Sequence, residues 1–207
     1  MTYGEIRTTF LTILNRSDCT DAMADDFLEQ GMARSQRMLK LPPQESLTSV
    51  AVGDDFEGID IPDDALRIIN LYIQDGTYDR VLTRISLKDY LAKARSTDTP
   101  LWWTRNRSQL LLNPTPSSGT TIKLLYYAEF NSFTDDNDDT ALSIIAPDLF
   151  IYGGLVYAAD KYLDERLTRF ENRYQQIIAE LQNQADEDEL SGGAVISSAY
   201  EYPEENY

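Results

Sequence analysis

The segment 149–159 is the feature of this sequence that most limits its fold. It is eleven residues long, carries no charge and is apolar on every side when drawn as a helix. A helix of this kind has to be buried on all sides, so other elements must enclose it. It is far too short to span a membrane, which takes ~20 apolar residues. Pro147 suits its first turn, and Gly154 and Ala158, four residues apart, would let another helix approach closely.

Three further helices are predicted. Thr2 and Glu5 form a possible capping box for the first, and the second covers about residues 20–40, where Pro42-Pro43 stops it. The third is amphipathic, with an apolar face made of Leu167, Phe170, Tyr174, Ile177, Ile178 and Leu181. The acidic residues 186–189 have the wrong sign for the C-terminal end of a helix dipole, so we expect the third helix to fray there.

Residues 46–130 have a different character. Asp75-Gly76 lies between two β-rich runs and is a strong signal for a hairpin. Further strands are expected at 101–103, 110–112 and 122–130. A short helix capped by Ser86 precedes them, and residues 113–119 form a turn-rich loop. We interpret this region as one small antiparallel sheet.

Together these elements predict an α+β fold. It consists of a mainly helical body, made of an N-terminal helix pair and two C-terminal helices, with a small antiparallel β insertion and an extended C-terminal tail. The predicted boundaries place the helical body at residues 1–42 and 141–186, the β subdomain with its short helix at 43–140, and a flexible acidic–aromatic tail at 187–207. A chain of 207 residues is long enough for such an arrangement.

The net charge of −17 comes from 35 acidic and 18 basic side chains. Residues 186–207 hold seven acids and no Lys or Arg, and residues 135–139 add four more acids. The remaining body is therefore only mildly acidic. Because affinity for nucleic acid comes from cationic contacts with phosphates, this balance disfavours a DNA-binding protein.

The composition excludes histidine-dependent catalysis. There is no histidine, which removes Ser-His-Asp and Cys-His catalysis and every histidine metal site. Cys19 is the single cysteine, so no internal disulfide forms, as is usual in a reducing compartment. The many carboxylates fall in runs or on polar faces, where a solvated surface is the simpler interpretation than an acid/base pair. We predict no catalytic, metal-binding or cofactor-binding residues.

One acidic loop resembles a calcium-binding motif. Asp135, Asn137 and Asp139 alternate like the first ligands of an EF-hand loop. That loop also needs Gly at its sixth position and Glu at its twelfth, where this chain has Thr140 and Ala146. We therefore expect a plain solvated loop.

One aromatic–basic pattern resembles a platform for single-stranded nucleic acid. Trp102 and Trp103 are followed by Arg105 and Arg107, and bases stack on aromatic rings in such platforms. No second basic cluster supports this interpretation. A packed strand with a partner surface is favoured instead.

The C-terminal tail sets apolar and aromatic residues among glycines, serines and glutamates. A purely solvating tail is usually poor in aromatics, so this one is typical of a segment that orders when it binds a partner. The predicted partner-binding residues are Val195, Ile196, Tyr200, Tyr202 and Tyr207. An ordinary disordered terminus is the alternative interpretation.

Several stretches resemble phage head-to-tail adaptor (connector) proteins over nearly the whole chain. They agree in length and order of elements and not in catalytic motifs. They are residues 1–7 with 11–17, 113–116 with 124–127, 146–149 with 162–166, and 186–193.

The resemblance implies a fold and a function. The fold is a helical body with a β insertion and a C-terminal extension. The function is a structural one: a ring of copies, typically twelvefold, in the virion neck beneath the portal protein, with a tail or nozzle protein below it. The protein is made in the bacterial host cytoplasm, has no cofactor and no membrane contact, and double-stranded DNA passes without specific binding.

Two alternatives stay open. One is a carboxylate-based hydrolase whose cleft assembles from residues distant in sequence. The other is a different neck component, such as a stopper or tail-completion protein, which differs from an adaptor only in its position along the axis.

Overall fold

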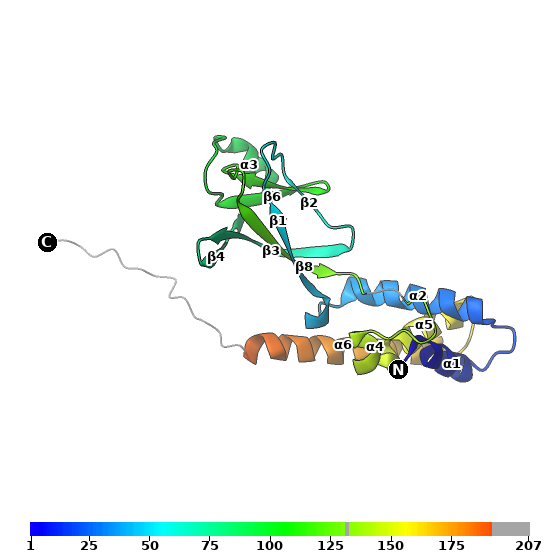
Figure 1. The fold of residues 1–207 in the computed structure, drawn as a ribbon. Coiled ribbons are helices and arrows are strands. Elements are labelled where there is room, and N and C mark those ends of the chain that lie inside the picture. Colours follow the sequence, from blue (N-terminus) through cyan, green and yellow to red (C-terminus); the bar gives the residue numbers. More distant parts are fainter. Residues whose placement is uncertain (131–132, 192–207) are drawn as a thin grey trace.

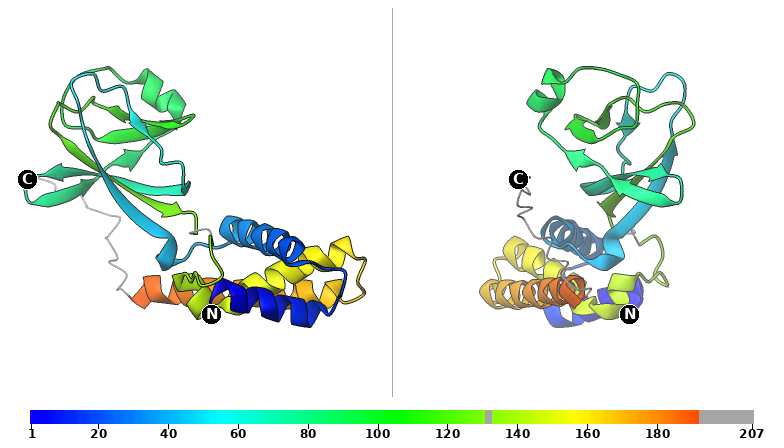
Figure 2. Two further views of the ribbon diagram at one scale, coloured as in Figure 1. Left: turned by 45° about the vertical axis from the view of Figure 1, so that its right-hand side comes forward. Right: turned by 90° about the vertical axis from the view of Figure 1, so that its left-hand side faces the viewer.

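The computed structural model describes residues 1–130 and 133–191, which form two lobes (Figure 1). The helical lobe contains α1 (Tyr3–Leu14), α2 (Asp21–Met38), the short 3-10 helix η1 (Pro42–Gln44), α4 (Ala141–Ile145), α5 (Pro147–Lys161) and α6 (Leu167–Ser191). The β lobe lies between η1 and α4 in the chain and also contains the short helix α3 (Leu87–Ala92). Figure 2 shows from two further sides that the strands stand to one side of the helices. Each lobe has its own buried apolar core.

The β lobe consists of two four-stranded sheets that share one core. The first has the order β1 (Glu45–Ala51), β8 (Thr121–Ala128), β3 (Ala65–Asp75) and β4 (Tyr78–Val81), and all its pairs are antiparallel. The second has the order β2 (Ile59–Asp60), β7 (Gln109–Asn113), β6 (Trp102–Asn106) and β5 (Thr83–Arg84). Here β5 and β6 pair in parallel. The hairpin at Asp75-Gly76 is confirmed, because β3 and β4 pair across it.

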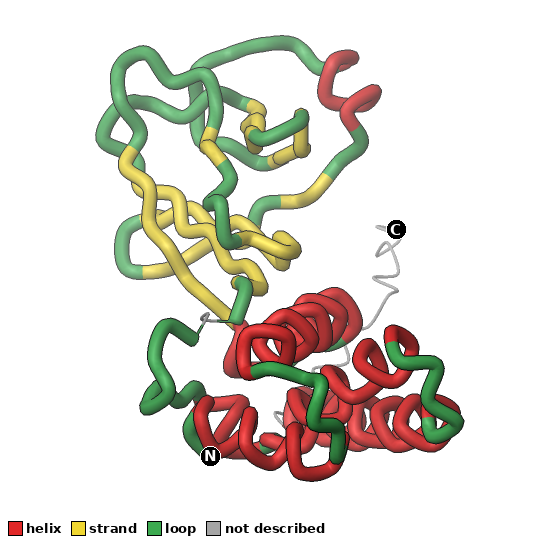
Figure 3. The backbone as a smooth tube through the Cα atoms, turned by 90° about the vertical axis from the view of Figure 1, so that its right-hand side faces the viewer, coloured by secondary structure: helices red, strands yellow, loops and turns green. Residues whose placement is uncertain are grey.

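The predicted fold class is wrong in its proportions. Of the described residues, 44% are helical and 24% are in strands, in a mixed structure with six α-helices and two sheets of four strands each. It is not a mainly helical body with one small β insertion. Figure 3 shows the strands gathered in one lobe together with one short helix, and the other helices in a second lobe. The prediction failed because β2 and β5 have two residues each, too few for a periodic pattern, and because strand pairing joins residues distant in sequence.

The helix α5 lies inside the helical lobe, as its apolar sequence predicts. It contacts α1, α2, α4 and α6, and its buried residues occupy all sides of the helix. The closest contact is with α2. A Cβ atom on Gly31 would lie 2.5 Å from the carbonyl carbon of Gly153 and 2.6 Å from the nitrogen of Gly154, so the two backbones touch. The predicted close helix approach at Gly154 is thus present, and it requires glycine at position 31 of α2.

Side chains satisfy both ends of α1. The capping box of Thr2 and Glu5 is confirmed at its start. At its end, the Arg166 guanidinium donates hydrogen bonds to the carbonyl oxygens of Ile13 (3.1 Å) and Leu14 (2.8 Å). Asp164 holds the same guanidinium at 2.7 Å, and these hydrogen bonds lower the pKa of Asp164 to about 2. Arg166 therefore joins the beginning of α6 to the end of α1.

The expected fraying of the last helix is wrong, because α6 continues through the acidic residues to Ser191. The helical segment thus extends five residues past the predicted boundary at 186. Ala185 is 5% exposed and belongs to the core of the helical lobe, and Gln182 donates a hydrogen bond to Asp186 (2.7 Å). Unfavourable dipole interactions of exposed acids cost only about 0.3–1 kcal/mol each, so packing outweighs them.

Gly31→Ala should lower the free energy of unfolding by about 1–3 kcal/mol, because the added methyl group forces two backbones apart. Urea unfolding followed by circular dichroism measures this loss. Gly53→Ala is the matched control, since nothing lies within 4 Å of the Cβ position there. Its effect should stay within about 0.5 kcal/mol. Equal effects of the two substitutions would contradict the close contact of α2 and α5.

Asp164→Asn should destabilise the chain at neutral pH and have less and less effect as the pH falls. The native pKa of Asp164, about 2, lies below the value for an unfolded aspartate, about 3.9. The stabilisation is therefore fully present above the unfolded pKa and is lost as the pH falls through the native pKa. Urea unfolding at about pH 7, pH 4 and pH 2 compares variant and wild type. A difference that stays constant over this range would rule out a contribution from the ionised carboxylate.

Candidate partner-binding surfaces

The residues predicted to bind a partner, Val195, Ile196, Tyr200, Tyr202 and Tyr207, lie outside the described residues. The described part of the chain ends with α6 at Ser191.

Within residues 1–130 and 133–191, no three His, Cys, Asp or Glu side chains gather as they would around a metal ion. In the same part of the chain, no helix combines the length and apolar character needed to cross a membrane.

The acidic loop at residues 135–139, which precedes α4, contacts the start of α1. The Asp138 carboxylate accepts hydrogen bonds from the backbone N–H groups of Thr134 and Asp135 and from the Thr134 hydroxyl, which lower the pKa of Asp138. Asp136 pairs with Arg7 at 2.6 Å. The carbonyl oxygens of Asp136 and Asp138 accept hydrogen bonds from backbone N–H groups at the start of α1. This loop thus holds the start of α1 in place through hydrogen bonds and an ion pair.

The two tryptophans do not form a platform for bases. Trp103 is 1% exposed, and its indole N–H donates a hydrogen bond to the carbonyl oxygen of Leu82 (3.2 Å). The Arg84 guanidinium lies over the Trp103 ring, and the Lys93 ammonium lies 3.6 Å from the centre of the Trp102 ring. Side chains of the lobe already occupy these rings, which favours the packed-strand interpretation.

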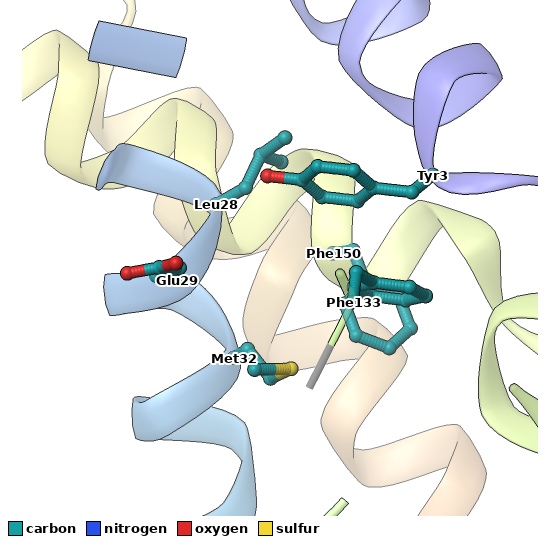
Figure 4. A pocket seen from close by; sticks show the side chains of 6 residues that line it. All are labelled: Tyr3, Leu28, Glu29, Met32, Phe133 and Phe150. Atoms are coloured by element: carbon teal, nitrogen blue, oxygen red, sulfur yellow. The ribbon is translucent and has the colours of Figure 1, made fainter. Parts of the chain in front are cut away.

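A cavity of about 200 Å³ opens between α1, α2 and α5. Figure 4 shows Tyr3 and Phe133 on one side of it and side chains of α2 on the other. Its lining is mostly apolar and consists of Tyr3, Leu28, Glu29, Met32, Phe133 and Phe150. The rings of Tyr3 and Phe133 are stacked with their centres 4.7 Å apart, and Phe133 meets Phe150 edge-on.

The Tyr3 hydroxyl at this cavity already has a hydrogen-bond partner. The Tyr3 hydroxyl donates a hydrogen bond of 2.7 Å to Asp25, which also pairs with Arg7 at 3.2 Å. Burial and the hydrogen bond to Asp25 raise the pKa of Tyr3 well above its usual value. Tyr3 therefore stays protonated at neutral pH and is unsuited to acid/base catalysis. Its hydrogen bond to Asp25 joins α1 to α2.

A second cavity, of about 210 Å³, lies near the end of α6. Its lining is largely apolar: Leu41, Pro42, Pro43, Leu142, Ile145, Leu181, Gln184, Ala185 and Asp188. The neighbouring residues Ile144 and Ile145 of α4 are 60% and 61% exposed. Clustered exposed apolar side chains are typical of protein contact surfaces, so this end of the helical lobe is a candidate surface for one.

Sequence reasoning missed the separation of charge within the β lobe. Residues 84–95 carry four cations and one acid, whereas residues 54–60 carry four acids and no cation. The structure places these segments at opposite edges of the second sheet, beside β5 and β2. A count of charge along short windows, in place of acidic runs alone, would have found both segments.

A family model described as SU10 adaptor protein matches residues 1–197 of the chain. No curated protein matches it. The family match covers both lobes and agrees with the resemblance to phage head-to-tail adaptors that the sequence segments carry. The chain therefore belongs to the SU10 adaptor protein family.

Proposed function

We propose that the chain is a structural protein of the phage neck, a head-to-tail adaptor whose copies form a ring below the portal. The ring connects the capsid to the tail and lines the passage for DNA. The family match over residues 1–197 carries this proposal. The partners are the portal protein above, neighbouring copies in the ring and a tail or nozzle protein below, and the resemblance implies twelve copies.

Two ion-paired carboxylates of the helical lobe are unsuited to the role of general acid in a carboxylate-based hydrolase. The pKa of Asp164 is lowered by Arg166, and the pKa of Glu171 is lowered by Arg34, whose guanidinium it binds at 2.6 Å. A general acid needs a pKa near the working pH, so carboxylates held in their ionised form by arginines do not suit that role. The Arg34–Glu171 pair joins α2 to α6, and Arg166, held by Asp164, reaches the end of α1.

A stopper or tail-completion protein is the second candidate, and it differs in position along the axis. The family match favours the adaptor position directly on the portal. Electron microscopy of the purified chain mixed with purified portal separates the two. An adaptor adds a ring to the portal alone, whereas a stopper needs the adaptor in place first.

Removal of residues 192–207 should abolish or greatly weaken attachment to the portal. This segment contains the proposed anchors Val195, Ile196, Tyr200, Tyr202 and Tyr207, and buried aromatic side chains carry much of the binding energy at interfaces. Thermal unfolding should change little, because both described cores consist of residues before position 186. Co-sedimentation with portal measures attachment. If the shortened chain attaches as well as the full chain, the portal contact lies in the lobes.

Duplex DNA should show no detectable binding to the chain at physiological salt. The net charge of −17 repels phosphates, and a neck ring that lets DNA slide should not hold it. An electrophoretic mobility assay tests this with the full chain. A shift at micromolar protein that weakens steeply with added salt would contradict a non-binding passage.

A further inference from the structure

The second sheet of the β lobe has one basic edge and one acidic edge. The basic edge consists of Arg84, Lys88, Lys93 and Arg95, with the single acid Asp89 among them, on β5, α3 and the residues that follow α3. The acidic edge consists of Asp54, Asp55, Glu57 and Asp60, on β2 and the loop before it. The strands β6 and β7 separate β5 from β2 in the sheet.

Neither edge is neutralised within its own chain. Among the ion pairs of the described residues, none includes a charged group of either edge. Arg84 and Lys93 are placed by the tryptophan rings beneath them, and Lys88 and Arg95 are exposed. On the other side, Asp60 accepts a hydrogen bond from the neutral Gln109, and the other three acids are exposed. Both edges therefore present uncompensated charge to solvent.

We propose that copies of the chain contact one another head to tail, the basic edge of one β lobe against the acidic edge of the next. This inference rests on the proposed ring of copies and names the surface that joins them. A contact between two different patches of the same protein is heterologous, and it generates a ring when the rotation closes. Opposite edges of one sheet provide such a pair of patches.

Apolar side chains next to the cations support a protein partner. Leu87 and Leu91 are four residues apart on α3, so they lie on one side of that helix, and they are 39% and 65% exposed. Phosphates would leave these leucines in water, whereas a protein surface can cover them. The acidic edge of a second copy supplies the matching charge, so a second copy explains both features better than duplex DNA does.

The contact is weak in the free protein and becomes stable only when copies are held together. Net charges of −17 repel each other at long range, and exposed ion pairs contribute about 0–1 kcal/mol each. Complementary charge of this kind sets orientation and association rate more than affinity. Attachment to one portal would raise the effective concentration of neighbouring copies and complete the ring.

Charge exchange between the edges tests the contact in the full chain, without portal. The first variant, Lys88→Glu with Arg95→Glu, removes the net positive charge of the basic edge. The second, Asp54→Lys with Asp55→Lys, gives the acidic edge two cations. Sedimentation velocity of concentrated protein should show self-association of the wild type and about tenfold weaker association of each variant alone, because one of the two facing edges then no longer carries a net charge opposite to the other. An equimolar mixture of the two variants should recover the association.

Two controls separate local contact from net charge. Arg169→Glu with Arg173→Glu, at exposed positions of α6, changes the net charge as much as the first variant and should associate like the wild type. The second variant is less negative than the wild type, so a net-charge effect alone would strengthen its association. Zero-length carboxyl–amine cross-linking of mixed isotope-labelled and unlabelled copies should join Lys88 or Lys93 of one copy to Asp54 or Asp55 of another.

Three results would overturn the proposal. The first is a wild-type chain without self-association at the highest soluble concentration, and the second is a mixture of variants that associates no better than each alone. The third is a first variant that loses binding to duplex DNA but associates with itself as the wild type does. The basic edge would then be a phosphate-binding surface. None of these assays contains portal, so a negative result here contradicts the edge contact and does not test portal binding. Conversely, a chain that does not bind portal could still form the edge contact.

Discussion

The rest of the helical lobe depends on the contact between the backbones of α2 and α5. Gly31 meets Gly153 and Gly154 so closely that a single methyl group cannot be accommodated. The same two glycines of α5 lie against Phe10 from α1 and Tyr174 from α6. The packing of α1, α2 and α6 against α5 is therefore constrained at Gly153 and Gly154, because each of the three helices contacts α5 there.

The helical lobe in turn holds the β lobe by both of its ends. Leu39 and Leu41, which precede the first strand, and Phe130, which follows the last one, all belong to the core of the helical lobe. The second core lies entirely in the β lobe and draws on both sheets. The β lobe therefore has its own core and is joined to the helical lobe by two chain connections. Its second sheet projects from the helices, so a neighbouring molecule can reach the edges of that sheet (Figure 2).

The net charge of this protein is a poor guide to its local surfaces. A value of −17 suggests uniform repulsion between copies, yet the described β lobe has one edge of cations and one of acids. Repulsion between whole copies and attraction between two matched edges are compatible. Salt screens the repulsion beyond about a Debye length, whereas charges of the two edges attract each other at contact distance. This balance is consistent with the proposed contact between copies that are held together on a portal.

The sequence by itself determined the central apolar helix, the capping box at Thr2, the Asp75-Gly76 hairpin and the family resemblance, since each rests on neighbouring residues. It misjudged the β content and the end of α6. Only the tertiary structure decided the two-sheet lobe, the glycine contact, the reach of Arg166 to α1 and the opposition of the charged edges. These features join residues distant in the chain, and local periodicity contains no information about which distant segments will pack together.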